Sequence, residues 1–398
     1  MTKSTLQLIF QELQDHQDEV IHWRRHLHQH PELSFQEFET ATFIKEKLQS
    51  FGLEIKTNIG GNGVIAILNG QKKGPTIGLR ADFDALPIND GKDVPYKSTN
   101  PGVMHACGHD GHTAALLGTA RILSKYKDKI SGSIIFIFQH AEEKPPGGAK
   151  AMIEELNIDE IDYIFAAHLA SDIPIGKVAV GAGFKMAAVD KFEIIVHGKG
   201  GHGAKPQETN DPIVIGSDLV NAFQKIVSRR VDPLDSAVVT LGVFHAGNAF
   251  NVIPNEARLE GTVRSFSEEV RKQVKENIYS LVKGITDGYQ ASFNIDYLHG
   301  YPALYNPQKE TAVITQLFTE LLGEENVVEF QTSMGAEDFA YFLNEKPGSY
   351  FKVGSRNHDG RTQFPHHHPN FDIDERALLI IQETFVKIVS HYVLIDEA

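Results

Sequence analysis

The sequence of 398 residues has little of several features that would assign it to a particular protein class. It contains a single cysteine, Cys107, so no disulfide can form within the chain. Its longest apolar runs, such as residues 134–138, are far shorter than the roughly 20 residues that a transmembrane helix requires. No apolar stretch with a cleavage site follows the first methionine, so we expect no signal peptide. These absences predict a cytoplasmic protein without a membrane segment.

Basic side chains are also in the minority. Lysine and arginine number 38 against 52 aspartates and glutamates, which gives a formal net charge of −14. A nucleic-acid-binding protein normally carries a basic stripe, and this sequence has none. The hydrophobic content of 41% and the charged content of 23% are those of an ordinary globular protein, which excludes a disordered or fibrous chain. Histidine, by contrast, is abundant, with 19 residues whose positions bear on function.

The length of the chain suits two domains, and the order of the predicted elements indicates their arrangement. Strands and helices alternate up to about residue 185 and again after residue 298, which is typical of an α/β domain. Residues 186–297 instead show the order β-α-β-β-α-β of a split ferredoxin-like unit. The sequence therefore predicts a catalytic α/β domain with a mixed sheet, formed by residues 1–185 and 298–398, and an inserted α+β domain at residues 186–297.

Within the α/β part, residues 1–30 are expected to form one amphipathic helix. A second helix is expected from Ser34 to Gly52, with Glu37 completing a capping box. Later helices are predicted at residues 110–126, 149–156, 310–322 and 374–392. Strands are predicted at residues 53–59, 63–68, 76–81, 133–138, 163–167 and 350–353.

Side chains that can bind metal follow three of the predicted strands. Asp82 comes after the strand at 76–81, Glu142 and Glu143 come after the strand at 133–138, and His168 comes after the strand at 163–167. In open α/β sheets, ligands bind beyond the carboxyl ends of the strands, so we expect these side chains to lie close together. Two loops, MHACGHD at 104–110 and PHHHP at 365–369, add cysteine and histidine.

This set of side chains points to metal-assisted hydrolysis. Cysteine, histidine and carboxylate together are the usual ligands of zinc, and they also suit manganese, cobalt and nickel. Glu142 and Glu143 are adjacent, and adjacent residues of an extended segment point in opposite directions. One of them could therefore bind metal while the other accepts a proton from a water molecule.

Eight motifs, in order along almost the whole chain, resemble a single family. They are RRHLHQHPELS (24–34), DFDALPI (82–88), MHACGHDGH (104–112), AEE (141–143), GGHGAKP (200–206), NVIP (251–254), GAEDF (335–339) and HHP (367–369). Each motif alone is a weak signal, but the ordered set is specific. It resembles the amidohydrolases typified by hippurate hydrolase and the plant auxin-conjugate hydrolases. These are N-acyl-amino-acid hydrolases within the wider binuclear-metal group of aminoacylases and carboxypeptidases.

The resemblance implies two divalent metal ions and a set of residues that hold them. The implied ligands are Cys107, His109, Glu143, His168 and His367. Cys107 would bridge the two ions as a thiolate, and Glu142 would act as general base and then as proton donor to the leaving amine. Three consecutive histidines leave the last ligand ambiguous, and His366 and His368 are the alternatives to His367.

One motif departs from the pattern of the wider group. A His-x-Asp sequence usually follows the early strand there, and its histidine binds metal. This chain has Arg80-Ala81-Asp82 at that place, so His109 is implied to replace the missing ligand. Asp82 is then expected to orient a ligand rather than to bind metal itself.

The inserted domain is implied to act as a lid and as the dimerisation domain. His202, in a glycine-rich loop, matches a lid histidine that approaches the substrate across a homodimer. Asn251 and Arg264 are candidates for gripping the substrate carboxylate, since a guanidinium pairs with a carboxylate through two hydrogen bonds. Glu337 is a further candidate for the pocket.

Three rival functions stay open from the sequence, and the third, a non-enzymatic ligand-binding protein, is hard to reconcile with Glu142 beside a full set of ligands. A dipeptidase or carboxypeptidase would use the same metal site on a different substrate. An amidase with Cys107 as nucleophile would need no metal, and it would resist chelators and lose activity when its thiol is alkylated.

Overall fold

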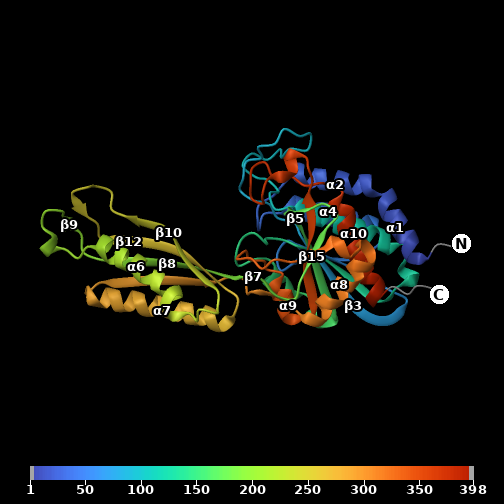
Figure 1. The fold of residues 1–398 in the computed structure, drawn as a ribbon. Helices are drawn as coiled ribbons and strands as arrows, with labels where there is room; N and C mark the ends of the chain where they lie inside the picture. The colour runs from blue at the N-terminus through green and yellow to red at the C-terminus, as the bar shows by residue number, and fades with distance from the viewer. Residues whose placement is uncertain (1–3, 394–398) are drawn as a thin grey trace. The chain divides into compact units, whose positions relative to one another are not determined.

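The computed structural model describes residues 4–393, and the chain divides into two compact units (Figure 1). Unit 1 contains the described residues up to Lys185, together with Tyr305–Gln331 and the described residues from Asp338 onward. Unit 2 contains Met186–Leu304 and Thr332–Glu337. The chain thus leaves unit 1, forms most of unit 2 as one insertion, and returns.

Unit 1 is built on an eight-stranded sheet with the order β1-β2-β4-β3-β5-β16-β6-β15. Parallel pairing joins β4, β3, β5 and β16 in its centre and β6 to β15 at one edge. The pairs β1–β2, β2–β4 and β6–β16 are antiparallel, so the sheet is mixed as predicted. The strands are β1 (Glu54–Ile59), β2 (Gly63–Asn69), β3 (Lys72–Asp82), β4 (Ser131–Gln139), β5 (Tyr163–Pro174), β6 (Val178–Val180), β15 (Val327–Glu329) and β16 (Gly348–Arg356). Two short strands, β7 (Gly183–Met186) and β14 (Leu304–Asn306), pair with each other. They lie in the two segments of the sequence that connect unit 1 with unit 2.

Helices cover the central strands of unit 1. The helix α4 contacts β3, β4 and β5, and α10 contacts β3 and β16, while α1 and α2 pack on α4 and α10 as an outer layer (Figure 1). The sheet face beneath α4 is apolar and fully buried, as at Leu79 and Phe136, because parallel strands with helices against them are shielded from water. The helices are α1 (Thr5–Asp15), α2 (Gln17–Gln29), α3 (Phe38–Ser50), α4 (His109–Ser124), α5 (Ala149–Glu155), α8 (Gln308–Leu322), α9 (Ala340–Glu345) and α10 (Ala377–Tyr392).

Two local predictions near the N-terminus are wrong. The expected single helix over residues 1–30 is two helices within its described part, because the side chain of His16 bonds to the carbonyl of Glu12 and closes α1 at Asp15. The expected capping box from Ser34 to Glu37 does not form. Ser34 donates its hydroxyl to Asp84, and Glu37 is fully buried, so both side chains serve tertiary contacts instead of the helix end.

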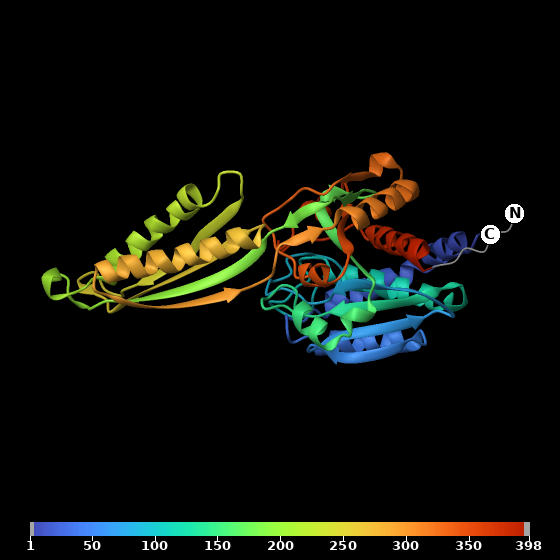
Figure 2. The same ribbon diagram turned by 90° about the horizontal axis from the view of Figure 1, so that it is seen from below.

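The four long strands and two helices of unit 2 follow the predicted β-α-β-β-α-β order, and two short strands, β9 and β11, are added to it. Its four-stranded antiparallel sheet has the order β10-β12-β8-β13, with α6 and α7 packed on one face (Figure 2). The opposite face carries cross-strand ion pairs such as Lys191–Glu260 and Arg258–Glu193, which suit a solvent-facing surface. The elements are β8 (Ala188–His197), β9 (Gly201–His202), α6 (Pro212–Arg230), β10 (Ala237–Ala246), β11 (Val252–Ile253), β12 (Glu256–Ser265), α7 (Glu268–Gly288) and β13 (Ser292–His299).

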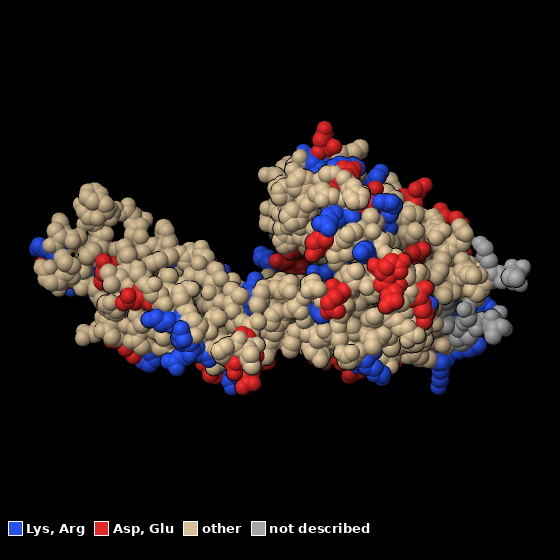
Figure 3. All heavy atoms as spheres, in the orientation of Figure 1, with Lys and Arg blue, Asp and Glu red and all other residues tan. Residues whose placement is uncertain are grey.

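Between residues 4 and 393, no helix combines the length and the apolar character needed to cross a bilayer. Acidic and basic side chains are interspersed on the face of unit 1 shown in Figure 3, where lysines and arginines form no continuous stripe.

Candidate metal centre

The sheet register brings the predicted strand-end residues of unit 1 to one edge. Asp82 of β3 pairs with Gln139 of β4, and Arg80 of β3 pairs with Ala166 of β5. His168 lies two residues beyond Ala166 and is therefore level with Asp82. It was expected just after its strand, but β5 continues to Pro174, so His168 projects from within the strand.

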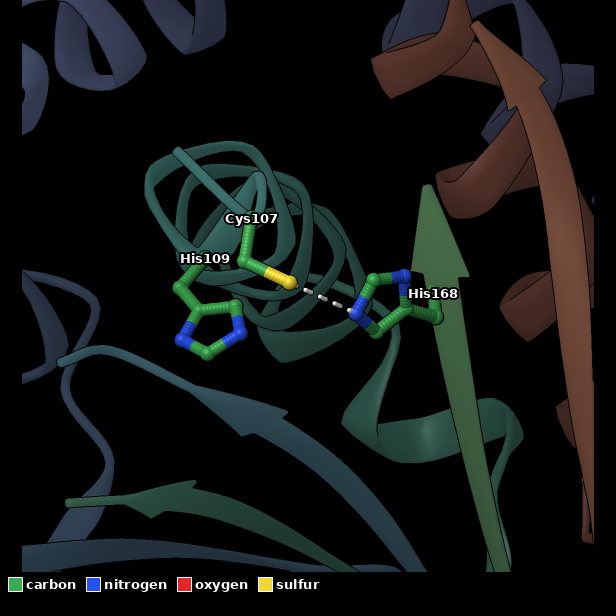
Figure 4. A group of neighbouring side chains, drawn as sticks. All are labelled: Cys107, His109 and His168. Carbon is green, nitrogen blue, oxygen red and sulfur yellow. Dashed lines mark hydrogen bonds between the residues drawn. The ribbon is translucent and has the colours of Figure 1, made fainter. Parts of the chain in front are cut away.

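Cys107, His109 and His168 form the first group of possible ligands (Figure 4). Cys107 and His109 come from the turn into α4, and the sulfur points toward β5, where Sγ lies 3.5 Å from Nε2 of His168. Nδ1 of His168 donates to the carbonyl of Leu169 at 2.6 Å, which leaves the lone pair of Nε2 directed at the group. Burial lowers the pKa of His168 well below its usual range, so its ring is neutral, the form that binds metal.

His109 is held by Asp84, a residue that the sequence analysis did not single out. Nδ1 of His109 lies 3.0 Å from the carbonyl of Asp84 and 3.1 Å from its Oδ1. Burial opposes a charge on His109, but Asp82, Asp84 and Glu143 outweigh it and raise the pKa of His109 to about 10. The position therefore favours a positive charge, which either a proton or a metal ion can provide.

Glu143 and His367 complete a second group with Cys107. Nε2 of His367 lies 3.3 Å from Oε1 of Glu143, and the backbone of Glu143 donates to Asp84 at 2.9 Å. His367 has a φ of 64°, a left-handed backbone conformation that is uncommon for residues other than glycine.

The other two histidines of the 365–369 loop have different contacts. Nε2 of His366 accepts the backbone N–H of Ser171 at 3.3 Å. Nδ1 of His368 accepts the backbone N–H of Asn370 at 3.0 Å, and its ring stacks on Phe364. Of the three histidines, only His367 belongs to a group of possible ligands in the described chain.

Glu142 lies beside the same centre, in a group with His109 and Glu143, and its side chain is only 7% exposed. The preceding residue, Ala141, has a φ of 53° and therefore turns the chain sharply before the two glutamates. This turn lets two consecutive carboxylates face one centre from different directions.

Asp82 contacts two side chains behind the centre. Its Oδ2 accepts from Arg80 at 2.6 Å and its Oδ1 accepts Nδ1–H of His112 at 2.7 Å, while Nε2 of His109 is 3.8 Å away. Burial opposes its charge, but Arg80, His109 and His112 hold the pKa of Asp82 well below the usual range. Asp82, His109 and His112 are close enough to hold an ion, but both ring nitrogens of His112 are already hydrogen-bonded. The predicted orienting role therefore suits Asp82 better than a ligand role.

The remaining predicted site residues belong to unit 2. Val252 pairs with His202 across β9 and β11, and the carbonyl of Asn251 accepts the backbone N–H of Gly203, so His202 and Asn251 are neighbours. Arg264, on β12, is half-buried and donates to Thr262 and to the carbonyl of Val263. Glu337 is buried, with 2% of its surface exposed.

The donor atoms of unit 1 fit divalent metal ions. Nε2 of His109 and Oε1 of Glu143 are buried and have no hydrogen-bond partner among residues 4–393, which is costly unless another group occupies the space between them. One thiol, three imidazoles and a carboxylate are also the mixture that zinc and similar metals prefer.

Glu37 supports the turn that carries the two glutamates. Its Oε1 accepts the N–H of Ala141 and its Oε2 accepts from Asn62, both at 2.9 Å. Burial raises the pKa of Glu37 from 4.5 to about 7, and the nearby Asp84 adds to the effect.

Because the folded pKa of Glu37 is raised, its contribution to stability is complete below pH 4.5 and is lost as the pH rises through 7. The loss amounts to about 3 kcal/mol. Glutamine does not ionise, so we expect Glu37→Gln to remove the pH-dependent contribution of this carboxyl. The free energy of unfolding of the variant should then fall less between pH 4.5 and 8 than that of the wild type. Denaturant unfolding of metal-free protein across this range measures the difference. Glu39→Gln, an exposed position two residues later at the start of α3, is the control and should leave the pH dependence unchanged.

Three known proteins illustrate the similarity of this chain to others. It is 48% identical to the N-acyl-L-amino acid amidohydrolase of Geobacillus stearothermophilus, over 77% of this chain and 82% of the relative. It is 41% identical to thermostable carboxypeptidase 1 of Saccharolobus solfataricus, over 91% of this chain and 92% of that protein. A solved structure from Bacillus subtilis, a dinuclear metal-binding peptidase of the M20 family, matches with a TM-score of 0.80 at 35% identity and covers 94% of this chain and 98% of that chain.

The family resemblance predicted from the eight motifs is confirmed by these relatives. The sequence pattern of peptidase family M20/M25/M40 matches residues 78–391, a range that takes in the central strands and all the residues of the candidate centre. Since the match covers well over half of the sequence, the chain belongs to peptidase family M20/M25/M40.

Proposed function

We propose that this protein is a metal-dependent amidohydrolase that cleaves the amide bond of N-acyl amino acids. The observation that carries the proposal is the adjacent pair of glutamates. Both lie near His109, but only Glu143 also belongs to the group with Cys107 and His367. One carboxylate is therefore placed to bind metal, and the other remains to move a proton. A relative named an N-acyl-L-amino acid amidohydrolase supports the substrate class.

The proposed ligands of two divalent ions, whether manganese, zinc, cobalt or nickel, are Cys107, His109, Glu143, His168 and His367. Bound there, the ions would polarise the amide carbonyl and make a water molecule acidic enough to attack it. Cys107 belongs to two groups of possible ligands, one with His109 and His168 and the other with Glu143 and His367. This double membership supports a bridging role for its thiolate.

Glu142 performs the proton transfers. It accepts a proton from the attacking water and then donates it to the departing nitrogen, so a single carboxylate serves both steps. Its low exposure suits this role because few water molecules can compete for the carboxylate. Asp84 keeps His109 oriented while the reaction proceeds, through the hydrogen bonds to Nδ1.

Unit 2 supplies the proposed contacts to the substrate. His202 of β9 and Asn251, just before β11, are neighbours; His202 is proposed to approach the substrate, and Asn251 and Arg264 to bind its carboxylate. Glu337 is proposed to line the pocket.

We further propose a cytoplasmic homodimer that pairs through unit 2. Unit 2 exposes several large apolar side chains, which supports a surface that pairs with another chain; among them are Val214 (47%), Phe244 (42%), Phe250 (103%) and Val252 (54%).

A mixed panel of N-acyl amino acids and dipeptides tests the substrate class. With added divalent metal and a reductant, we expect amino-acid release from the acyl substrates, loss of this release after chelation, and recovery when manganese, zinc or cobalt is restored. Turnover that resists the chelator and stops on thiol alkylation would contradict the metal mechanism and support Cys107 as a nucleophile.

A carboxypeptidase or dipeptidase is the second candidate function, and the 41% identity to a thermostable carboxypeptidase favours it. The same panel separates the two functions, because a peptidase would release amino acids from the dipeptides faster than from the N-acetyl and N-benzoyl derivatives.

A further inference from the structure

His112 is a buried histidine for which the proposed function has no role. It lies in α4 three residues after His109, with 2% of its surface exposed, and its ring is 4.5 Å from that of His168. Its ring nitrogens bond to Asp82 and to the backbone of Leu169, so neither is directed at the proposed ligands.

The partners of His112 determine its tautomer. Nε2 lies 2.9 Å from the backbone nitrogen of Leu169, which can only donate, so Nε2 must carry the lone pair. The proton is therefore on Nδ1, which donates it to Oδ1 of Asp82 at 2.7 Å. His112 thus links Asp82, after β3, to the backbone of β5.

The backbone N–H of Leu169 bonds to His112 at a point where β5 is no longer paired with β3. The pairing of β3 with β5 ends at Arg80 and Ala166, so beyond that point β3 no longer supplies acceptors to β5. The imidazole of His112 takes the place of the missing carbonyl. A buried N–H without any acceptor would destabilise this part of the strand.

The carbonyl of the same residue, Leu169, orients a proposed metal ligand. The carbonyl of Leu169 accepts Nδ1–H of His168 at 2.6 Å, which directs Nε2 of His168 toward Cys107. A shift of Leu169 would therefore rotate His168 away from the centre.

The other end of the link is rigidly held. Asp82 accepts from Arg80 at 2.6 Å, and Arg80 also donates to Gln139 at 2.8 Å and to Asp338 at 2.9 Å. All four side chains are buried, so neither they nor His112 can readily move.

We propose that His112 is a positioning residue: it holds the backbone of Leu169 in place through its N–H, and the carbonyl of the same residue orients His168 toward one of the two metal ions. The inference rests on the proposed function, because it takes His168 to be a metal ligand. Arg80, which stands where the wider group has a metal-binding histidine, serves in this chain to anchor the same link through Asp82.

Two substitutions separate the two hydrogen bonds of His112. In His112→Gln, the amide oxygen can replace Nε2 as the acceptor for Leu169. In His112→Asn, the shorter amide can replace only Nδ1 as the donor to Asp82. We expect His112→Asn to weaken binding of one of the two zinc equivalents by about 10–100-fold, and His112→Gln to retain the affinity within a few-fold of the wild type.

Zinc titration of metal-free protein against a chromogenic chelator measures the affinities, and thermal unfolding of the metal-free variants shows how far each is destabilised. Thr119→Val removes a buried hydrogen bond elsewhere in α4 and is the matched control, with unchanged zinc affinity expected. His168→Ala should weaken the same zinc equivalent as His112→Asn.

Equal zinc affinity in His112→Asn and the wild type would overturn the proposal. Equal losses in His112→Asn and His112→Gln would also overturn it, because the contact to Leu169 would then not be the one that matters. The zinc measurement needs no substrate. A failed substrate panel together with the expected zinc affinities would therefore overturn only the substrate class.

Discussion

Glu142→Gln is expected to lower kcat by about 10²–10⁴-fold while the protein keeps its fold and both metal equivalents. Glutamine has nearly the same shape as glutamate but cannot accept the proton of the attacking water. Glu142 lies with His109 and Glu143 at the centre and is 7% exposed, so an equal-sized side chain can fill its place without opening the site. Steady-state kinetics on the best acyl substrate, with metal content measured on the same sample, checks the result.

Glu143→Gln is the matched comparison, because it makes the same change one residue later. Oε1 of Glu143 is buried without a hydrogen-bond partner in the described chain and lies 3.3 Å from Nε2 of His367. We therefore expect this variant to lose metal, and its activity should partly return when excess metal is added. Full activity in Glu142→Gln would rule out Glu142 as the general base, and metal loss in both variants would assign both carboxylates to the ions.

Arg24→Met should lower the free energy of unfolding by about 3–5 kcal/mol, the largest stability effect that we expect from a single substitution in this chain. Arg24 is fully buried and contacts three carboxylates, Asp110 at 2.8 Å, Asp372 at 3.0 Å and Glu375 at 3.3 Å. Methionine fills the space but leaves Asp110 and Asp372 buried without their cation. Denaturant unfolding of the metal-free protein at neutral pH measures the loss.

Arg25→Met is the control for this substitution. Arg25 is the next residue of α2, and it pairs with Glu375 through a side chain that is 46% exposed. An exposed ion pair contributes about 0–1 kcal/mol, so the control should unfold almost as the wild type does. Equal effects of the two substitutions would show that the buried cluster around Arg24 does not stabilise the fold.

Most of the framework of unit 1 could be predicted from the sequence. The strands β1 to β5 and β16 were expected, because each is a run of apolar or alternating residues bounded by turn residues. The short strands β6, β7, β14 and β15 were missed, because three or four residues are too few to show a period. They exist because distant segments pair, as β15 does with β6.

The N-terminal capping box shows where local patterns mislead. Ser34 and Glu37 have the right types and spacing, but each makes a stronger contact elsewhere, to Asp84 and to the N–H of Ala141 respectively. Burial against another segment outweighs the modest free energy of a helix cap.

The sequence by itself determined the family, the α/β framework and the short stretches that hold every residue of the candidate centre, since cysteine, histidine and paired glutamates in ordered motifs are rare by chance. Only the tertiary structure decided which of His366, His367 and His368 faces Glu143, and that Asp84 and His112 hold the neighbouring histidines. The physical reason is that a hydrogen bond depends on distance and direction between atoms. Residues such as Asp82 and His112, 30 positions apart in the chain, reach a separation of 2.7 Å only when β3 and α4 have packed together.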